Sequence, residues 1–103
     1  INAEEVKKLS PVKTSKFQPS AAAIHPVLNK LFIVSSASNL LVIADLDGNP
    51  EFAFYLSKKL FPQAEGITFR SNGDMYISNE GQGGKGYILK FELLNLIKLN
   101  KIK

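Results

Sequence analysis

The chain of 103 residues contains no cysteine. It therefore forms no disulfide, builds no thiolate metal site and uses no cysteine nucleophile. It also lacks any uninterrupted apolar run near the ~20 residues that a membrane-spanning helix needs. Residues 1–5 have neither the basic start nor the apolar core of a signal peptide. The composition, 45% hydrophobic and 21% charged, is ordinary for one globular domain.

The middle of the chain carries no net charge. Residues 19–91 hold six basic and six acidic side chains, so the formal net charge of +4 lies entirely in residues 1–18 and 92–103. A nucleic-acid-binding protein more often carries a basic stripe with interleaved aromatic residues on its folded body. The charge pattern therefore argues against a nucleic-acid partner.

The order of local signals predicts one helix followed by strands. Asn2 and Glu5 form a capping box for a short helix over residues 2–9, and Pro11 ends it. Hairpin turns are expected at residues 47–49 and 72–73, because glycine tolerates the positive φ of a tight turn. The runs rich in β-forming residues lie at 22–25, 31–35, 40–45, 52–56, 65–69, 74–78 and 87–91.

The β-rich part repeats itself. Pro19 and Pro62 are 43 residues apart, and the aromatic-isoleucine pairs at 32–33 and 76–77 are 44 apart. Repeats of ~40–45 residues with four strands each are typical of β-propeller blades. Two unrelated meanders in a sandwich are the alternative, and the matched order of the motifs favours the repeat. We therefore predict an all-β fold, made of antiparallel four-stranded blades after a short N-terminal helix.

The domain organisation follows from this repeat. We expect a helix and connector over 1–18, one blade over 19–61, a second over 62–92 and a basic apolar tail over 93–103. Two blades form an incomplete ring, and open repeat ends leave apolar faces uncovered. Either upstream blades complete the ring or copies of the chain associate. The sequence leaves open whether the tail is a strand or a helix.

Four segments carry a resemblance to a known family. FQPSAAAIHP at 17–26, LFIVSS at 31–36, LFPQAEGITF at 60–69 and NGDMYISNEG at 72–81 resemble the SdiA-regulated proteins, with the match extending over about residues 1–92. The resemblance implies a bacterial propeller, distantly like NHL-repeat proteins, in the periplasm or cell envelope, exported or anchored to the membrane through a segment not in this chain. It also implies a calcium site. Where the family commonly has proline before Glu-Gly this chain has Ala64, which affects turn stiffness more than ligand chemistry.

Glu65 begins a predicted innermost strand, where its carboxylate would lie near the channel mouth of a propeller. By the 43-residue spacing its counterpart in the first repeat is Ala22, which cannot ligate. Asn79 and Glu80 follow the next strand and add an amide oxygen and a second carboxylate. Hard oxygen donors of this kind suit Ca²⁺, which takes six to eight oxygens. We therefore name Glu65, Asn79 and Glu80 as candidate metal ligands; the alternative is that both glutamates are solvated loop residues.

Two other features of the sequence indicate structural roles and not binding or catalytic ones. Residues 81–86 match G-x-G-x-x-G, but a strand is expected after them and not the helix whose N-terminus would hold a pyrophosphate. His25 is the only histidine and precedes Pro26 at a strand end, so a structural role is expected for it. No catalytic residue and no organic cofactor is predicted.

Two functions fit the sequence. The first is a noncatalytic envelope module that binds an unknown ligand or protein, with calcium as a structural or organising ion. The second is a metal-dependent propeller hydrolase of the lactonase or esterase kind, which needs an open coordination position and a general base. Fold alone does not decide between them, because propellers host both.

Overall fold

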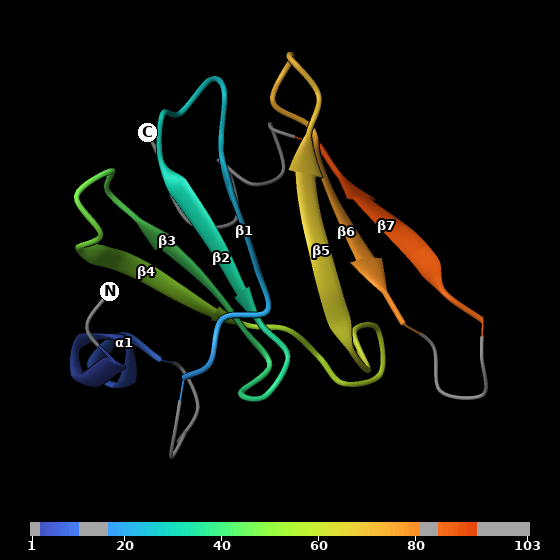
Figure 1. Cartoon of the computed structure of the whole chain (residues 1–103), viewed down its shortest axis with the longest axis horizontal. Helices are drawn as coiled ribbons and strands as arrows, with labels where there is room; N and C mark the ends of the chain where they lie inside the picture. The colour runs from blue at the N-terminus through green and yellow to red at the C-terminus, as the bar shows by residue number, and fades with distance from the viewer. Residues whose placement is uncertain (1–2, 11–16, 81–84, 93–103) are drawn as a thin grey trace.

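The computed structural model describes residues 3–10, 17–80 and 85–92. One helix, α1 (Ala3–Leu9), precedes two antiparallel sheets (Figure 1). The first sheet contains, in order, β1 (Ala21–Ile24), β2 (Leu31–Ser35), β3 (Leu40–Ala44) and β4 (Pro50–Tyr55). The second contains β5 (Ala64–Phe69), β6 (Met75–Asn79) and β7 (Tyr87–Phe91). The predicted all-β class with a short N-terminal helix is confirmed.

The second sheet has three strands in the described part of the chain, where the repeat predicts four. Asn2, residues 81–84 of the glycine-rich loop and the tail over 93–103 lie outside the described residues. The predicted division into two blades and two flanking segments stays a prediction. What the structure adds is that each repeat contributes one meander of neighbouring antiparallel strands.

Two glycines make the hairpin turns that the sequence predicts. Gly48 between β3 and β4 has φ 89°, and Gly73 between β5 and β6 has φ 97°. A residue with a Cβ is strained in this left-handed region, whereas glycine is not. Each turn also closes by a backbone hydrogen bond, from Gly48 N–H to Asp45 and from Gly73 N–H to Arg70.

The pairing register relates positions of the first sheet to positions of the second. Phe32 on β2 lies opposite Ala23 and Ile43. Tyr76 on β6 lies opposite Thr68 and Lys90 in the same way. Phe32 and Tyr76 therefore occupy matching positions in their sheets. The face of the first sheet that carries Phe32 corresponds to the face of the second sheet that carries Tyr76.

The main core lies between the two sheets. β1 and β5 lie side by side, as innermost strands of neighbouring blades do (Figure 1). Phe32 meets Phe69 edge to face across the interface, with ring centroids 5.1 Å apart, a favourable aromatic geometry. The buried residues of this intersheet core are Phe32, Val34, Leu41, Ile43, Leu56, Phe61, Ala64, Met75 and Ile77.

A second, smaller core lies on the other face of the first sheet. Val6 of α1 is fully buried there, and Phe17 joins it. They pack against the side chains that β2, β3 and β4 turn away from the second sheet, namely Ile33, Leu40, Val42 and Ala53. α1 thus occupies the face that a preceding blade would cover in a propeller, and so shields apolar surface that an open repeat would expose.

Candidate functional site

The three predicted ligands share one end of the β5–β6 pair. Glu65 is the second residue of β5, Asn79 is the last residue of β6, and Glu80 follows it. Ala64 is the pairing partner of Asn79, and the Glu80 N–H donates to the Gln63 carbonyl at 2.9 Å. The backbone therefore brings all three residues to one corner of the second sheet. Both glutamates are exposed there.

A β-bulge sets the position of Glu65. The pairing register shifts between Ala64 and Gly66, which leaves Glu65 as the extra residue in β5. A Cβ placed on Gly66 would overlap the Oγ of Ser78 on the neighbouring strand. The glycine of the Glu-Gly pair is thus required by the close approach of Ser78, and the bulge directs the preceding carboxylate outward.

Asn79 is the buried member of the set. Its side chain is 3% exposed, and neither Oδ1 nor Nδ2 has a hydrogen-bond partner among the described residues. The matched residue of the first sheet, Ser35, is also buried, and its Oγ accepts a hydrogen bond of 2.8 Å from Ser38 in the turn that follows. Residues 81–84, which follow Glu80 in the sequence, lie outside the described residues. A buried amide without a partner is costly, so this corner needs a polar group to complete it.

The donor set fits an oxygen-ligated cation only in part. Within the described ranges, no group of three or more His, Cys, Asp or Glu side chains gathers where it could hold a metal ion. Glu65, Asn79 and Glu80 offer two carboxylates and one amide oxygen, and Ca²⁺ would need backbone carbonyls and water in addition. The chain passes close above this corner, because a Cβ on Gly86 would lie 3.1 Å from the Asn79 carbonyl oxygen.

His25 joins the two sheets. Its Nδ1 accepts hydrogen bonds from the backbone N–H groups of Val27 at 3.1 Å and Leu28 at 3.0 Å. Because Nδ1 is an acceptor, the ring proton sits on Nε2, which donates to the Gly73 carbonyl oxygen at 2.9 Å. The ring is fully buried, and this desolvation lowers the pKa of His25, opposed by the bond to Gly73. Sequence reasoning gave His25 a structural role but did not find its partner.

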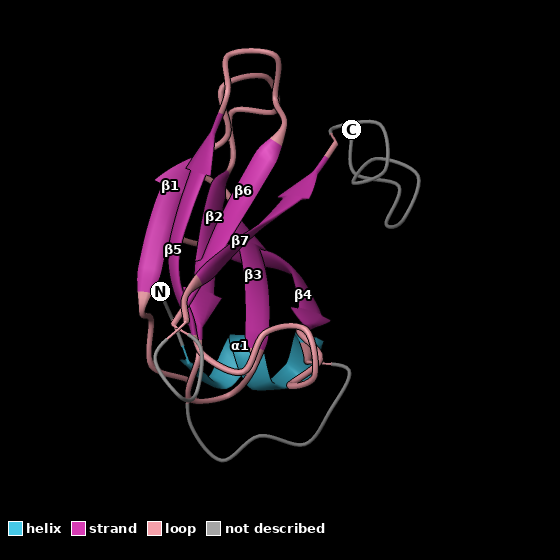
Figure 2. Cartoon of the chain, turned by 90° about the vertical axis from the view of Figure 1, so that its right-hand side faces the viewer, coloured by secondary structure: helices cyan, strands magenta, loops and turns pink. Residues whose placement is uncertain are grey.

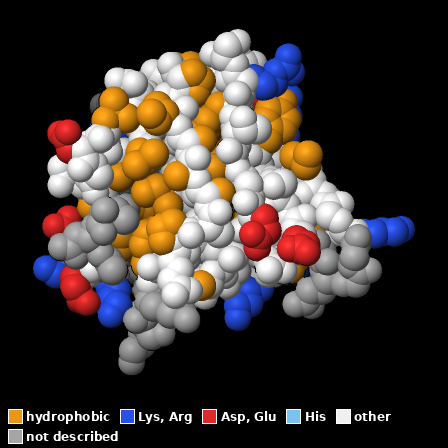
Figure 3. Space-filling model, viewed as in Figure 1, with side chains coloured by type: hydrophobic (Ala, Val, Ile, Leu, Met, Phe, Trp, Pro, Cys, Tyr) orange, Lys and Arg blue, Asp and Glu red, His pale blue; other side chains and the backbone are white. Residues whose placement is uncertain are grey.

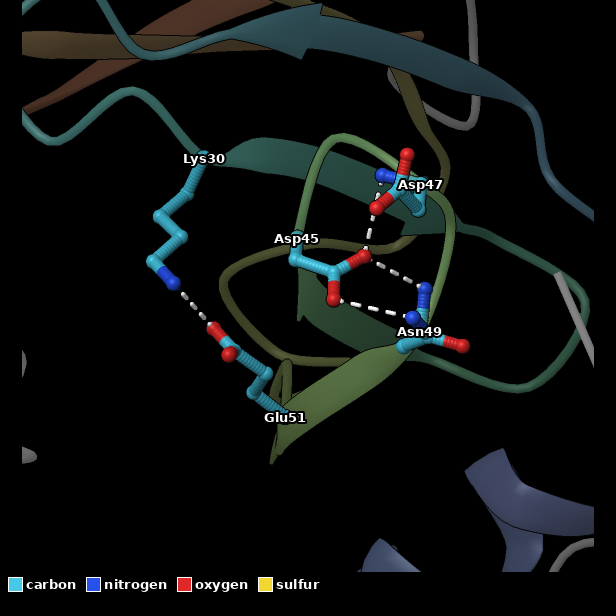
Figure 4. A network of polar contacts seen from close by, with 5 residues as sticks. All are labelled: Lys30, Asp45, Asp47, Asn49 and Glu51. Carbon is cyan, nitrogen blue, oxygen red and sulfur yellow. Dashed lines mark hydrogen bonds and ion pairs between the residues drawn. The ribbon is translucent and has the colours of Figure 1, made fainter.

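Asp45 organises the turn between β3 and β4 (Figure 4). Its Oδ1 accepts the backbone N–H groups of Asp47 at 3.0 Å and Asn49 at 2.8 Å, and its Oδ2 accepts the Asn49 side-chain amide at 2.9 Å. The Asn49 side chain is the main cause of a lowered pKa at Asp45, and its backbone N–H adds to it. Lys30 and Glu51 form an ion pair of 2.7 Å nearby. The Asp45 carboxylate thus serves the turn at residues 47–49 that the sequence predicted.

In the described part of the chain, the element that follows residues 81–86 is the strand β7. A strand in this place is expected for a connection between strands and not for a dinucleotide-binding turn. On the face shown in Figure 3, hydrophobic side chains gather over the first sheet while Lys and Arg lie scattered at the periphery. In the part of the chain that the structure covers, no helix has the length and apolarity to cross a membrane.

The family comparison agrees with the two-sheet architecture. A family model described as SdiA-regulated matches residues 3–82, which is most of the chain. The chain belongs to the SdiA-regulated family. Membership brings a propeller-like domain and does not define a biochemical role. No curated protein and no solved structure matches this SdiA-regulated chain.

Proposed function

We propose that this chain is a noncatalytic binding module of a bacterial cell-envelope propeller, and that a calcium ion organises its binding corner. Glu65, Asn79 and Glu80 would hold the ion. The observation that carries this proposal is the buried amide of Asn79, whose two polar atoms have no partner among the described residues. An ion or ligand at this corner would supply the missing partner for Oδ1.

The chemistry of the corner supports a hard cation. Glu65 and Glu80 are exposed carboxylates, the first on the strand paired with β6 and the second directly after Asn79. Carboxylate and amide oxygens are the side-chain ligands that calcium prefers. An ion here would tie the end of β5 to the segment after β6, and would thereby fix the surface that meets a ligand or protein.

The hydrolase alternative would need a metal ligand set and a general base from the same few side chains. Both nitrogens of His25 are engaged in backbone hydrogen bonds between the two sheets. Glu65 and Glu80 could each fill only one role, ligand or base. The geometry therefore favours binding over catalysis.

Thermal unfolding of the full chain with excess calcium and with EDTA tests the proposal. Calcium at about 100 times its Kd stabilises by about 2.7 kcal/mol, which raises Tm by roughly 10 °C for a domain of this size. Glu80→Gln and Asn79→Leu should both abolish this increase. In EDTA, Asn79→Leu should be at least as stable as the wild type, because leucine removes the unpaired buried amide.

The matched control is Asp47→Asn, which neutralises an exposed carboxylate in the β3–β4 turn. This variant should keep the full calcium response. A wild-type melt that is the same in calcium and in EDTA would contradict the metal role of this corner, and so would an undiminished response in Glu80→Gln and Asn79→Leu.

A further inference from the structure

The hairpin turn between β5 and β6 carries the only Asn-Gly pair of the sequence, Asn72-Gly73. The Asn72 side chain is exposed, whereas Gly73 is buried and its carbonyl oxygen accepts the hydrogen bond from His25. Figure 2 shows the loops at this end of the two sheets at the top of the view, away from α1. A chemical change at Asn72 would therefore act directly beside the contact between the sheets.

An asparagine that precedes glycine can lose its side-chain amide without an enzyme. The backbone nitrogen of Gly73, after losing its proton to water, attacks Cγ of Asn72. The bond from Cγ to Nδ2 then breaks, ammonia leaves with a proton, and a five-membered succinimide remains. Water opens this ring either to aspartate or to isoaspartate, in which the backbone runs through Cγ. Glycine permits the attack because it has no side chain to obstruct the approach of its nitrogen.

The hydrogen bonds of the turn act on both reacting groups. The Asp74 N–H donates to Oδ1 of Asn72 at 3.0 Å, which would stabilise the negative charge that develops on Oδ1 during the attack. Nδ2 of Asn72 donates to Oδ2 of Asp74 at 3.2 Å. The Gly73 N–H, in contrast, donates to the Arg70 carbonyl at 2.9 Å, and this bond opposes the loss of its proton. The turn must therefore open locally before Asn72 reacts.

His25 holds the turn closed. Its Nε2–H donates to the Gly73 carbonyl at 2.9 Å, and its ring packs against Phe69, the last residue of β5, at 4.6 Å between centroids. Both contacts exist only while the turn lies against the first sheet. Their loss would raise the fraction of molecules in which the turn is open, and with it the rate at Asn72.

The reaction would in turn weaken the same contact. A succinimide has no N–H at residue 73, so the bond to Arg70 is lost. Isoaspartate adds one carbon to the backbone before Gly73 and so displaces its carbonyl from His25. Aspartate would set a second carboxylate against Asp74 in place of the Nδ2 that bonds it. We propose that Asn72 is a site of spontaneous deamidation, that the His25–Gly73 contact sets its rate, and that its conversion loosens the contact between the two sheets.

Peptide mapping of the folded full chain, incubated at neutral pH in EDTA, tests the site. Asn72 should convert roughly tenfold or more faster than Asn29, because the side chain of Lys30 hinders the attack that glycine permits. Asn72→Ser keeps an oxygen that can accept the Asp74 N–H and should abolish the conversion at this position. Equal rates at Asn72 and Asn29 would overturn the proposal.

A pair of variants tests the control by His25. His25→Gln should raise the rate at Asn72 about threefold or more, since it weakens the contact that closes the turn. Val42→Ala is the matched control, because Val42 is fully buried in the smaller core and its truncation lowers global stability away from the turn. This variant should convert at nearly the wild-type rate. Equal acceleration in both variants would place the reaction in the globally unfolded chain, and an unchanged rate in His25→Gln would equally overturn the role of the contact.

Hydrogen exchange tests the consequence. Ion exchange separates the deamidated chain from its parent, because the product carries an added negative charge. The backbone N–H groups of Val27 and Leu28, which donate to His25 Nδ1, should exchange faster in the product. Identical exchange in parent and product would contradict the loosening. None of these measurements requires calcium, so their outcome is independent of the proposed function.

Discussion

The Nε2–H of His25 donates a 2.9 Å hydrogen bond to the carbonyl oxygen of Gly73, 48 residues away. This bond connects the turn after β1 with the hairpin between β5 and β6, so it crosses from one sheet to the other. The same ring packs against Phe32 at 5.3 Å and Phe69 at 4.6 Å between centroids. One side chain thus combines aromatic packing with three hydrogen bonds at the interface of the two sheets.

Replacement of His25 should loosen this interface. His25→Ala removes a fully buried ring and leaves three backbone groups without their partner, so we expect a loss of about 3–4 kcal/mol of unfolding free energy. His25→Gln, which can still reach some of these groups, should lose less. Urea unfolding at neutral pH, followed by circular dichroism, measures both. A loss in His25→Ala below about 0.5 kcal/mol, the range of surface substitutions, would contradict the role of this ring.

The same residue predicts how stability depends on pH. Burial lowers the pKa of His25 below its ordinary 6.5, so the unfolded chain takes up a proton that the folded chain resists. The contribution of the neutral ring is therefore complete above pH 6.5. It falls as the pH drops from 6.5 toward the folded-state pKa, with a slope of at most about 1.4 kcal/mol per pH unit.

His25→Gln removes this titration and serves as the control. Unfolding free energies measured in steps between pH 5 and 8 should decrease with acidity in the wild type and stay nearly flat in the variant. Equal slopes in the two proteins would show that His25 keeps an ordinary pKa in the folded state.

Gly66 and Ser78 offer a prediction about the bulge. Gly66→Ala places a Cβ against the Ser78 Oγ, and the serine must rotate to make room, at a cost of about 1 kcal/mol. Ser78→Ala should remove the conflict, because the Cβ of residue 78 lies at 3.7 Å, an ordinary contact distance. A double-mutant cycle by urea unfolding should show positive coupling between the two substitutions. Additive losses would place the role of Gly66 in its backbone alone.

The strands and turns could be predicted from local sequence. Runs of β-branched and aromatic residues gave each strand to within two residues, and the glycines of the turns at 48 and 73 adopt the positive φ that they favour. The packing of Phe32 and Phe69 between the sheets was also predictable, because both are aromatic residues at strand positions.

The alignment of the two repeats could not be read correctly from spacing. By the 43-residue spacing Glu65 corresponds to Ala22, but the pairing register matches Ala22 with Ile67. A bulge at Glu65 adds a residue to β5, and the turn after β5 is one residue shorter than the turn after β1, so no single spacing aligns all the strands. The partner of His25 was equally hidden, since a hydrogen bond to a backbone carbonyl leaves no side-chain signature in the sequence.

Asp45 carries the last prediction, on the β3–β4 turn. Its carboxylate accepts three hydrogen bonds from Asp47 and Asn49, which lower its pKa below the ordinary 3.8. The stabilisation is therefore complete above pH 3.8 and is lost as the pH falls through the folded-state pKa. Asp45→Ala should lower Tm at pH 7 more than Asp45→Asn, because asparagine keeps an acceptor for the backbone N–H groups. Melts repeated at decreasing pH should bring the wild type toward Asp45→Asn once the carboxylate is protonated. A difference between the two that does not change with pH would mean that the turn depends on the shape of residue 45 and not on its charge.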